Sequence, residues 1–159
     1  MIRILLPLAF VAAIYLGPMF SVQTTDSVRG ESTSVVTGDY FIGNAIDCLR
    51  ELKAPIGEEC ASDGEIQDST SVGSALSWAS MLAVAAAALG IVGLIPFVGR
   101  LTSVVTIAGG LGGLGAMGFF LLTMMNTADG LAGVQWGAYL AAGAALLTTI
   151  SGLSGMRGR

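Results

Sequence analysis

Histidine is absent from this sequence of 159 residues, and charged residues make up only 11% of it. Without histidine, the chain lacks the side chain that most often serves as a general base and as a metal ligand. Two cysteines alone are too few to complete a tetrahedral zinc site. The net charge of −4 argues against nucleic acid as a partner, because that requires a basic face. We therefore expect no catalytic residue, no metal site and no cofactor.

Apolar residues are abundant instead, at 53% of the chain with a mean hydropathy of +0.78. Long apolar stretches of this composition are typical of membrane proteins. Four stretches have the roughly 17 to 25 residues that a helix needs to cross a bilayer, and none carries an acidic or basic side chain inside. They are residues 4–20, 77–98, 101–125 and 134–153. We predict an all-α membrane protein, a bundle of four transmembrane helices forming a single membrane domain over residues 1–159.

The first of these stretches has a second interpretation. Arg3 precedes an apolar run, as in a secretory signal peptide. The following "LGPMFSV" lacks a clear cleavage site with small residues at alternate positions. We therefore expect this segment to be retained as a membrane span.

The basic residues next to the spans predict the orientation of the chain, because cytoplasmic flanks are enriched in lysine and arginine. With both termini cytoplasmic, the loop 21–76 is extracytoplasmic, and it contains ten of the eleven acidic residues and three basic ones. Trp78 and Trp136 then fall at the outer ends of their spans, where they would anchor the helices at the membrane interface. The four cytoplasmic basic residues are Arg3, Arg100, Arg157 and Arg159.

Both cysteines, Cys48 and Cys60, lie in this outer loop. On the oxidising side of a membrane a disulfide between them would persist. It would stabilise the loop by about 3 kcal/mol in the chain-entropy model, and a small extracytoplasmic domain usually needs such a cross-link. The alternative is two free thiols.

The rest of the outer loop gives weaker signals. "STSVVTGDYFIG" (32–43) is rich in β-branched and aromatic residues and predicts two short strands or a hairpin. "NAIDCLREL" (44–52) fits one or two helical turns, with Ile46 on the apolar face, or a strand. Residues 61–74 are polar and predict a linker or a loose turn. Alternatively, Asp68 and Ser69 could cap a short helix that leads into the membrane.

Acidic residues cluster toward the end of this loop. Carboxylate oxygens are the ligands that calcium prefers, but EF-hand spacing is absent. We interpret the cluster as a solvated acidic face, with calcium binding as the alternative. Its members are Glu58, Glu59, Asp63, Glu65 and Asp68.

Small residues recur at helical spacing within the spans. Such faces let helix backbones approach closely in the membrane. Either the bundle uses all of these faces, or one is left for a partner or a second copy. The predicted helix-packing positions are Gly109, Gly112 and Gly113 in the third span and Gly133, Gly137 and Ala141 in the fourth.

In its layout the chain resembles the claudin-like superfamily of claudins, peripheral myelin proteins and calcium-channel gamma subunits. "GNAIDC" places Gly43 and Cys48 at the spacing of the family's first-loop motif, and Cys60 follows near the expected distance. The tryptophan of that motif is replaced by Ala45. The resemblance implies a small outer β-sheet with a Cys48–Cys60 disulfide on a four-helix bundle, and roles in adhesion, barrier formation or as an auxiliary subunit.

We therefore expect a non-enzymatic membrane protein that acts by contacting membrane lipids and other proteins. It would be an accessory or structural subunit of a larger complex, or it would self-associate through its outer loop. The alternative is a small channel or transporter, formed by an oligomer that lines a pore with serine and threonine. Against that alternative, coupled transporters usually carry ionisable residues inside their spans.

Overall fold

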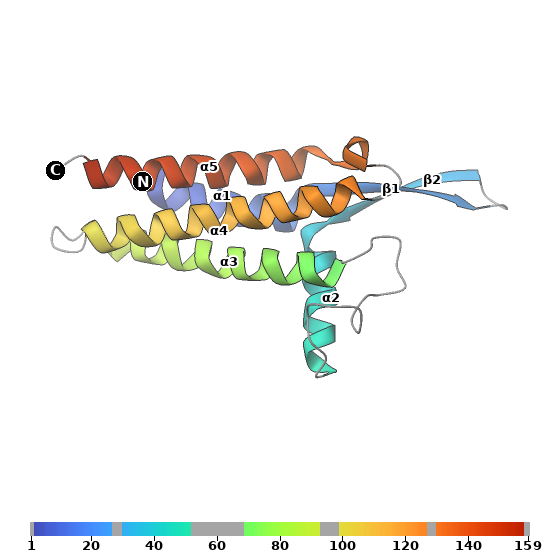
Figure 1. Cartoon of the computed structure of the whole chain (residues 1–159), viewed down its shortest axis with the longest axis horizontal. Helices are drawn as coiled ribbons and strands as arrows, with labels where there is room; N and C mark the ends of the chain where they lie inside the picture. Colours follow the sequence, from blue (N-terminus) through green and yellow to red (C-terminus); the bar gives the residue numbers. More distant parts are fainter. Residues whose placement is uncertain (1, 27–29, 52–68, 93–98, 127–129, 158–159) are drawn as a thin grey trace.

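The computed structural model describes residues 2–26, 30–51, 69–92, 99–126 and 130–157. Four helices pack side by side (Figure 1). Helices α1 and α4 each pack against both α3 and α5, which closes the bundle. The four helices are α1 (Ile2–Leu16), α3 (Ser69–Val92), α4 (Gly99–Met125) and α5 (Trp136–Arg157).

Three of the four helices are long and apolar enough to cross a membrane. They are the segments Thr70–Ile91, Thr102–Met125 and Trp136–Met156, and they support the predicted membrane protein with transmembrane helices. Helix α1 has 15 residues, which rise about 22 Å. That is shorter than a hydrocarbon core of about 30 Å, so α1 by itself falls short of a full span.

Two predicted helix boundaries differ from the structure. The first helix was expected over 4–20 but ends at Leu16, because Pro18 disfavours helical backbone at the residue before it, and a strand follows. The second was expected to begin at 77, yet α3 begins at Ser69. For residues 69–74 the linker is therefore wrong, and the alternative of a helix that leads into the span is confirmed. Polar composition favours a loop here, but tertiary contact favours the helix. Val72 and Gly73 are buried at the start of α3, where α3 packs against helix α2 (Gly38–Arg50).

In the described residues, the end of the bundle predicted to be extracytoplasmic has a hairpin, one helix and one 3-10 turn, and we call it the outer region. The hairpin pairs β1 (Pro18–Asp26) with β2 (Gly30–Thr37) in antiparallel register. Helix α2 (Gly38–Arg50) runs across the end of the bundle, and η2 (Gly130–Gly133) precedes α5 (Figure 1). Both termini lie at the opposite end of the bundle, together with the end of α3 and the start of α4 (Figure 1).

The hairpin and α2 partly match the predicted outer loop. Strand β2 covers 32–37, but its partner strand comes from 18–26, and 38–43 are helical. Helix α2 is the helical alternative of the two interpretations of 44–52. An amphipathic helix buries its apolar side, here Phe41, Ile42 and Ala45, whereas Ile46 is 43% exposed.

The core changes character along the bundle. Large buried side chains gather where α2 and the hairpin meet the helices, and the rings of Phe41 and Phe120 meet edge to face with centroids 5.7 Å apart. Further along the bundle, buried alanines and glycines occupy the contacts between helices, so the helices lie close together. The large buried side chains of the outer half include Ile14, Met19, Phe20, Leu76, Met117 and Met124, and the buried alanines include Ala83, Ala86, Ala87, Ala141 and Ala145.

Candidate functional site

The predicted small residues at the start of the last helix lie where α5 meets the end of α1 and β1. A β-carbon on Gly137 would lie 2.8 Å from the carbonyl carbon of Gly17, so the two backbones touch directly. A β-carbon on Gly133 would collide with the ring of Phe20. Ala141 is fully buried one turn further on. Gly133 and Gly137 therefore line one intramolecular contact, and Ala141 is buried inside the chain.

The predicted glycines of α4 face two different neighbours. A β-carbon on Gly109 would lie 3.3 Å from the backbone carbonyl oxygen of Leu82. One on Gly112 would lie 3.1 Å from Cδ1 of the same leucine, so both glycines face α3. Gly113 faces the other way, 3.0 Å from the β-carbon of Ala145 on α5. All six predicted packing positions are thus used inside the chain. Sequence reasoning missed Gly110, whose β-carbon would lie 2.7 Å from the backbone nitrogen of Thr149.

The two predicted interface anchors are both exposed, Trp78 at 69% and Trp136 at 57%. Trp136 is the first residue of α5. Trp78 is not at a helix end, because α3 begins earlier than predicted and places it about 13 Å along the axis from Ser69. Gly73, where α3 touches the backbone of Phe41 on α2, lies between Ser69 and Trp78. Trp78 therefore lies further along the bundle than the level at which α2 crosses.

The predicted disulfide is only half within the described residues. Cys48 lies on helix α2, outside the two-stranded sheet, whereas the claudin-like resemblance implied a cross-linked sheet. Cys60 and the acidic cluster of 58–68 lie outside the described residues. Among the described residues, no group of three or more histidine, cysteine, aspartate and glutamate side chains is placed to hold a metal ion. Gly43 has open space beside it on α2.

The base of the hairpin is fixed to the bundle. Gln135 donates its backbone N–H to the carbonyl of Met19 at 3.0 Å and its side-chain amide to the Ser21 hydroxyl at 3.1 Å. Ser21 in turn donates to the carbonyl of Gly133 at 3.3 Å. Phe20 and Val134 form an isolated bridge beside these contacts. In the sequence, the signal for these hydrogen bonds is Gln135, the glutamine directly before the last helix.

Beyond Ser21 the hairpin extends away from the bundle (Figure 1). Its pairing continues from Val22–Ser34 to Asp26–Gly30, and within the described residues the sheet has two strands. We call residues 22–26 and 30–34 the hairpin edge, because each strand there has one side without a strand partner in the described part of the chain. Such rows of free N–H and C=O groups are templates for pairing with another chain.

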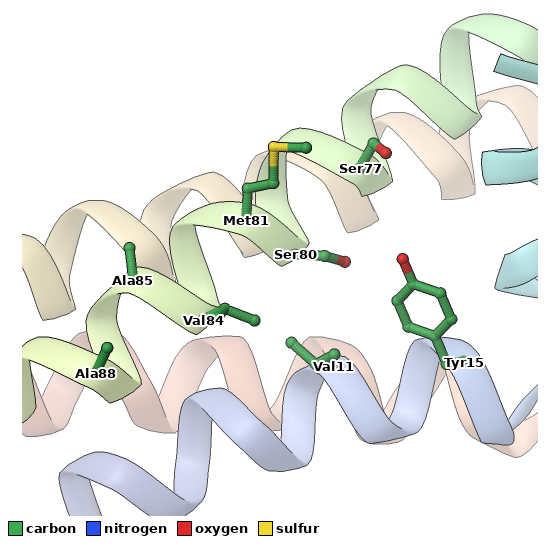
Figure 2. Close-up of a pocket in the computed structure, with 8 residues that line it drawn as sticks. All are labelled: Val11, Tyr15, Ser77, Ser80, Met81, Val84, Ala85 and Ala88. Carbon is green, nitrogen blue, oxygen red and sulfur yellow. The ribbon is translucent and has the colours of Figure 1, made fainter. Parts of the chain in front are cut away.

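A groove lies between α1 and α3 (Figure 2). It has a volume of about 520 Å³ and is lined from α1 by Val11 and Tyr15 and from α3 by residues between Ser77 and Ala88. The hydroxyls of Tyr15, Ser77 and Ser80 lie toward the hairpin end, and aliphatic groups continue the groove away from it (Figure 2). We call this cavity the α1–α3 groove.

Ser80 is the unusual member of this groove. Its side chain is 6% exposed, and its hydroxyl has no hydrogen-bond partner. Buried polar groups in proteins are normally paired, as shown by Thr106, which donates to the carbonyl of Thr102 at 2.7 Å. The spacing of Ser77 and Ser80 by three places both on one helical face, and this signal could have been read from the sequence.

Comparison with known proteins identifies no relative: no family model, curated protein or solved structure matches the chain. Function must therefore be argued from the geometry. Among the described residues, the groove offers hydroxyls, and the hairpin edge offers backbone hydrogen-bonding groups. Both arrangements suit binding.

Proposed function

We propose that this chain is a non-enzymatic, multi-pass membrane protein that acts by contacting other proteins through its hairpin edge. One observation carries the proposal: a two-stranded hairpin extends well beyond the bundle, held at its base. From Ser21 to Asp26 the strand continues for about 17 Å. Isolated two-stranded hairpins are marginally stable in water, whereas a third strand or a packed helix stabilises them. A strand from another chain would supply that stabilisation, as in β-strand addition.

The composition of the hairpin supports such pairing. Natural proteins protect exposed edges with charges, prolines or bulges. Here Pro18 and the register shift before Phe20 lie at the base of the hairpin, and Asp26 and Glu31 lie near its tip. Between them both strands carry uncharged residues rich in threonine, serine and valine, which favour strand pairing.

We further propose four membrane passages with both termini cytoplasmic. In support, the termini share one end of the bundle (Figure 1), and Arg3, Arg100 and Arg157 belong to the helix ends located there. Basic residues favour the cytoplasmic side. Helix α1 would complete its passage with the first residues of β1, which are buried at Met19 and Phe20. The hairpin and α2 are then extracytoplasmic, with Trp78 near the outer interface.

The channel alternative has less support. Three buried threonines of α4 and α5 donate to carbonyls of their own helix: Thr106 to Thr102, Thr148 to Ala144 and Thr149 to Ala145, at 2.7 to 3.0 Å. These hydroxyls are therefore satisfied within the helices and do not line a polar path through one copy. A pore would have to form between copies, and ion flux through reconstituted liposomes would reveal it.

The test is extraction of the full chain from native membranes in mild detergent, followed by native mass spectrometry. We expect a complex of defined stoichiometry, and the variant Thr33→Lys should release the partner, because Thr33 is exposed in the hairpin edge and charges block edge pairing. Ala132→Lys, also at the outer end and exposed, is the matched control and should retain the partner. A foreign subunit identifies an accessory protein, and additional copies identify self-association. A wild-type chain that runs alone would overturn the proposal.

The claudin-like relationship remains a proposal with its own test. It requires a Cys48–Cys60 disulfide, so the full chain alkylated without reductant should show no added mass, and reduction should expose two thiols. Two alkylated thiols in the unreduced chain would remove the cysteine motif on which the resemblance depends. The contact through the hairpin edge does not depend on this result.

A further inference from the structure

We propose that the α1–α3 groove binds an uncharged lipid-like amphiphile, a molecule with one apolar chain and a hydroxyl or carbonyl head. The head would meet the hydroxyls of Tyr15, Ser77 and Ser80, and the chain would lie along Val84 and Ala88. The groove is separate from the hairpin edge, so lipid binding here would be a second activity, independent of the proposed contact with other proteins.

The hydroxyl of Ser80 carries the inference. It is buried and without a hydrogen-bond partner, although a helical serine can donate to the carbonyl four residues earlier. Thr148 makes that bond to Ala144 at 2.7 Å. Figure 2 shows the Ser80 hydroxyl directed into the space between α3 and α1, on the side of the Tyr15 ring. Ser74 of the same helix also has an unpaired hydroxyl, but only Ser80 of the two lines the groove, where a partner from outside the chain can supply the missing hydrogen bond.

The lining of the groove indicates an uncharged head. Its polar groups are the three hydroxyls, and the described lining residues include no acidic or basic side chain. A charged head buried here would lose hydration without gaining a counter-ion, which is strongly unfavourable in an apolar environment. Hydroxyls both donate and accept hydrogen bonds, so an alcohol or an ester carbonyl fits them.

The remaining part of the groove fits an apolar chain. From Ser80 to Ala88 the helix rises about 12 Å, and along this length Val84, Ala85 and Ala88 line the groove. The alanines leave space that larger side chains would fill. The volume of about 520 Å³ lies within the range of roughly 300 to 1,000 Å³ typical of ligand pockets. Val84 is 50% exposed, so the groove is open along its side, and an amphiphile could enter from the bilayer.

A transmembrane helix of a partner protein is the competing occupant. Its backbone carbonyls are already bonded within the helix, so it would need a polar side chain at the depth of Ser80. An amphiphile brings its own oxygen next to its chain, which matches the separation of hydroxyls and aliphatic groups along the groove. We therefore favour the amphiphile.

The test uses the full chain in detergent micelles and a monoacylglycerol with a diazirine in its acyl chain. Illumination followed by peptide mapping should place the label on α1 and α3 around Val11 and Val84. Unlabelled monoolein should compete for this labelling. 1-Octadecene, which has a chain of similar length without the polar head, should compete about tenfold less, because it leaves the Ser80 hydroxyl unpaired.

Two variants separate the head contact from the chain contact. Ser80→Ala should weaken competition by monoolein about five- to tenfold and leave competition by octadecene unchanged, whereas the control Ser154→Ala, an exposed serine of α5, should change neither. Ala85→Leu should abolish labelling by filling the groove, and the control Ala108→Leu, at an exposed position of α4, should preserve it. Helix content by circular dichroism verifies that each variant is folded.

Two results would overturn the proposal. Labelling spread evenly over the lipid-facing sides of all four helices, unaffected by Ser80→Ala and Ala85→Leu, would show an ordinary lipid shell. A photoreactive residue at position 84 that captures a protein chain in native membranes would assign the groove to a partner helix.

Discussion

The two halves of the bundle differ in the size of the side chains that fill them. Near the hairpin and α2, large side chains such as Phe41, Phe120 and Met124 fill the space between elements. Toward the termini, helix backbones approach until glycines and side chains touch directly, as at Gly110 and Thr149. The outer half is therefore sensitive to lost volume, and also to added volume at close contacts such as Gly137, whereas the half near the termini is sensitive mainly to added volume.

This difference follows from the surroundings of each half. Between membrane helices, lipid is as apolar as leucine, so association depends on close van der Waals packing and favours small residues. The outer half must instead attach α2 and a hairpin base to the bundle, and under the proposed topology burial of apolar area away from water contributes to its stability. Substitutions that exchange the two modes of packing therefore test the comparison directly.

The largest effect is expected from Phe120→Ala, which removes a fully buried ring that contacts Phe41. We expect a loss of about 3 kcal/mol, the lower end of values for such truncations. SDS unfolding followed by circular dichroism measures it. Phe119→Ala is the matched control: Phe119 is 37% exposed, and its truncation should cost far less. Equal losses would show that the outer half does not depend on filled volume.

Gly110→Ala should have the next largest effect. Its β-carbon would lie 2.7 Å from the backbone nitrogen of Thr149, so α4 and α5 must separate. Overpacking of this kind costs about 1 to 3 kcal/mol. Gly115 on the same helix has nothing within 4 Å, and Gly115→Ala is the control in the same unfolding assay. If Gly110→Ala is as stable as Gly115→Ala, then α4 and α5 do not approach each other as closely at Gly110 as the structure shows.

A smaller loss is expected from Thr106→Val, which preserves shape and removes the hydrogen bond to the Thr102 carbonyl. Hydrogen bonds within membrane proteins contribute about 0.6 kcal/mol on average, so the change should approach the precision of the SDS assay. Thermal unfolding in mild detergent gives an independent reading. A loss above 2 kcal/mol would mean that the Thr106 hydroxyl also makes a hydrogen bond to another helix.

Much of the bundle could be predicted from the sequence, because apolar length and small-residue spacing depend on local composition. The helix over 101–125 was located within two residues, and Gly109, Gly112 and Gly113 were expected to pack against other helices. The outer boundaries were harder. The helical start of α3 depends on contact with α2, and β1 uses residues that appeared to continue an apolar helix. The groove hydroxyls belong to two helices distant in sequence, so their proximity depends on the packing of α1 against α3.

Gly143→Ala should have the smallest effect, with the opposite sign. Gly143 lies in α5 with nothing within 4 Å of an added β-carbon, so the substitution meets no neighbour. Alanine also loses less conformational freedom than glycine in a helix, which favours the folded chain by roughly 0.5 to 1 kcal/mol. The SDS concentration at the unfolding midpoint should therefore rise slightly. A clear destabilisation would show that this face of α5 contacts another chain, and that the half near the termini also contributes to assembly.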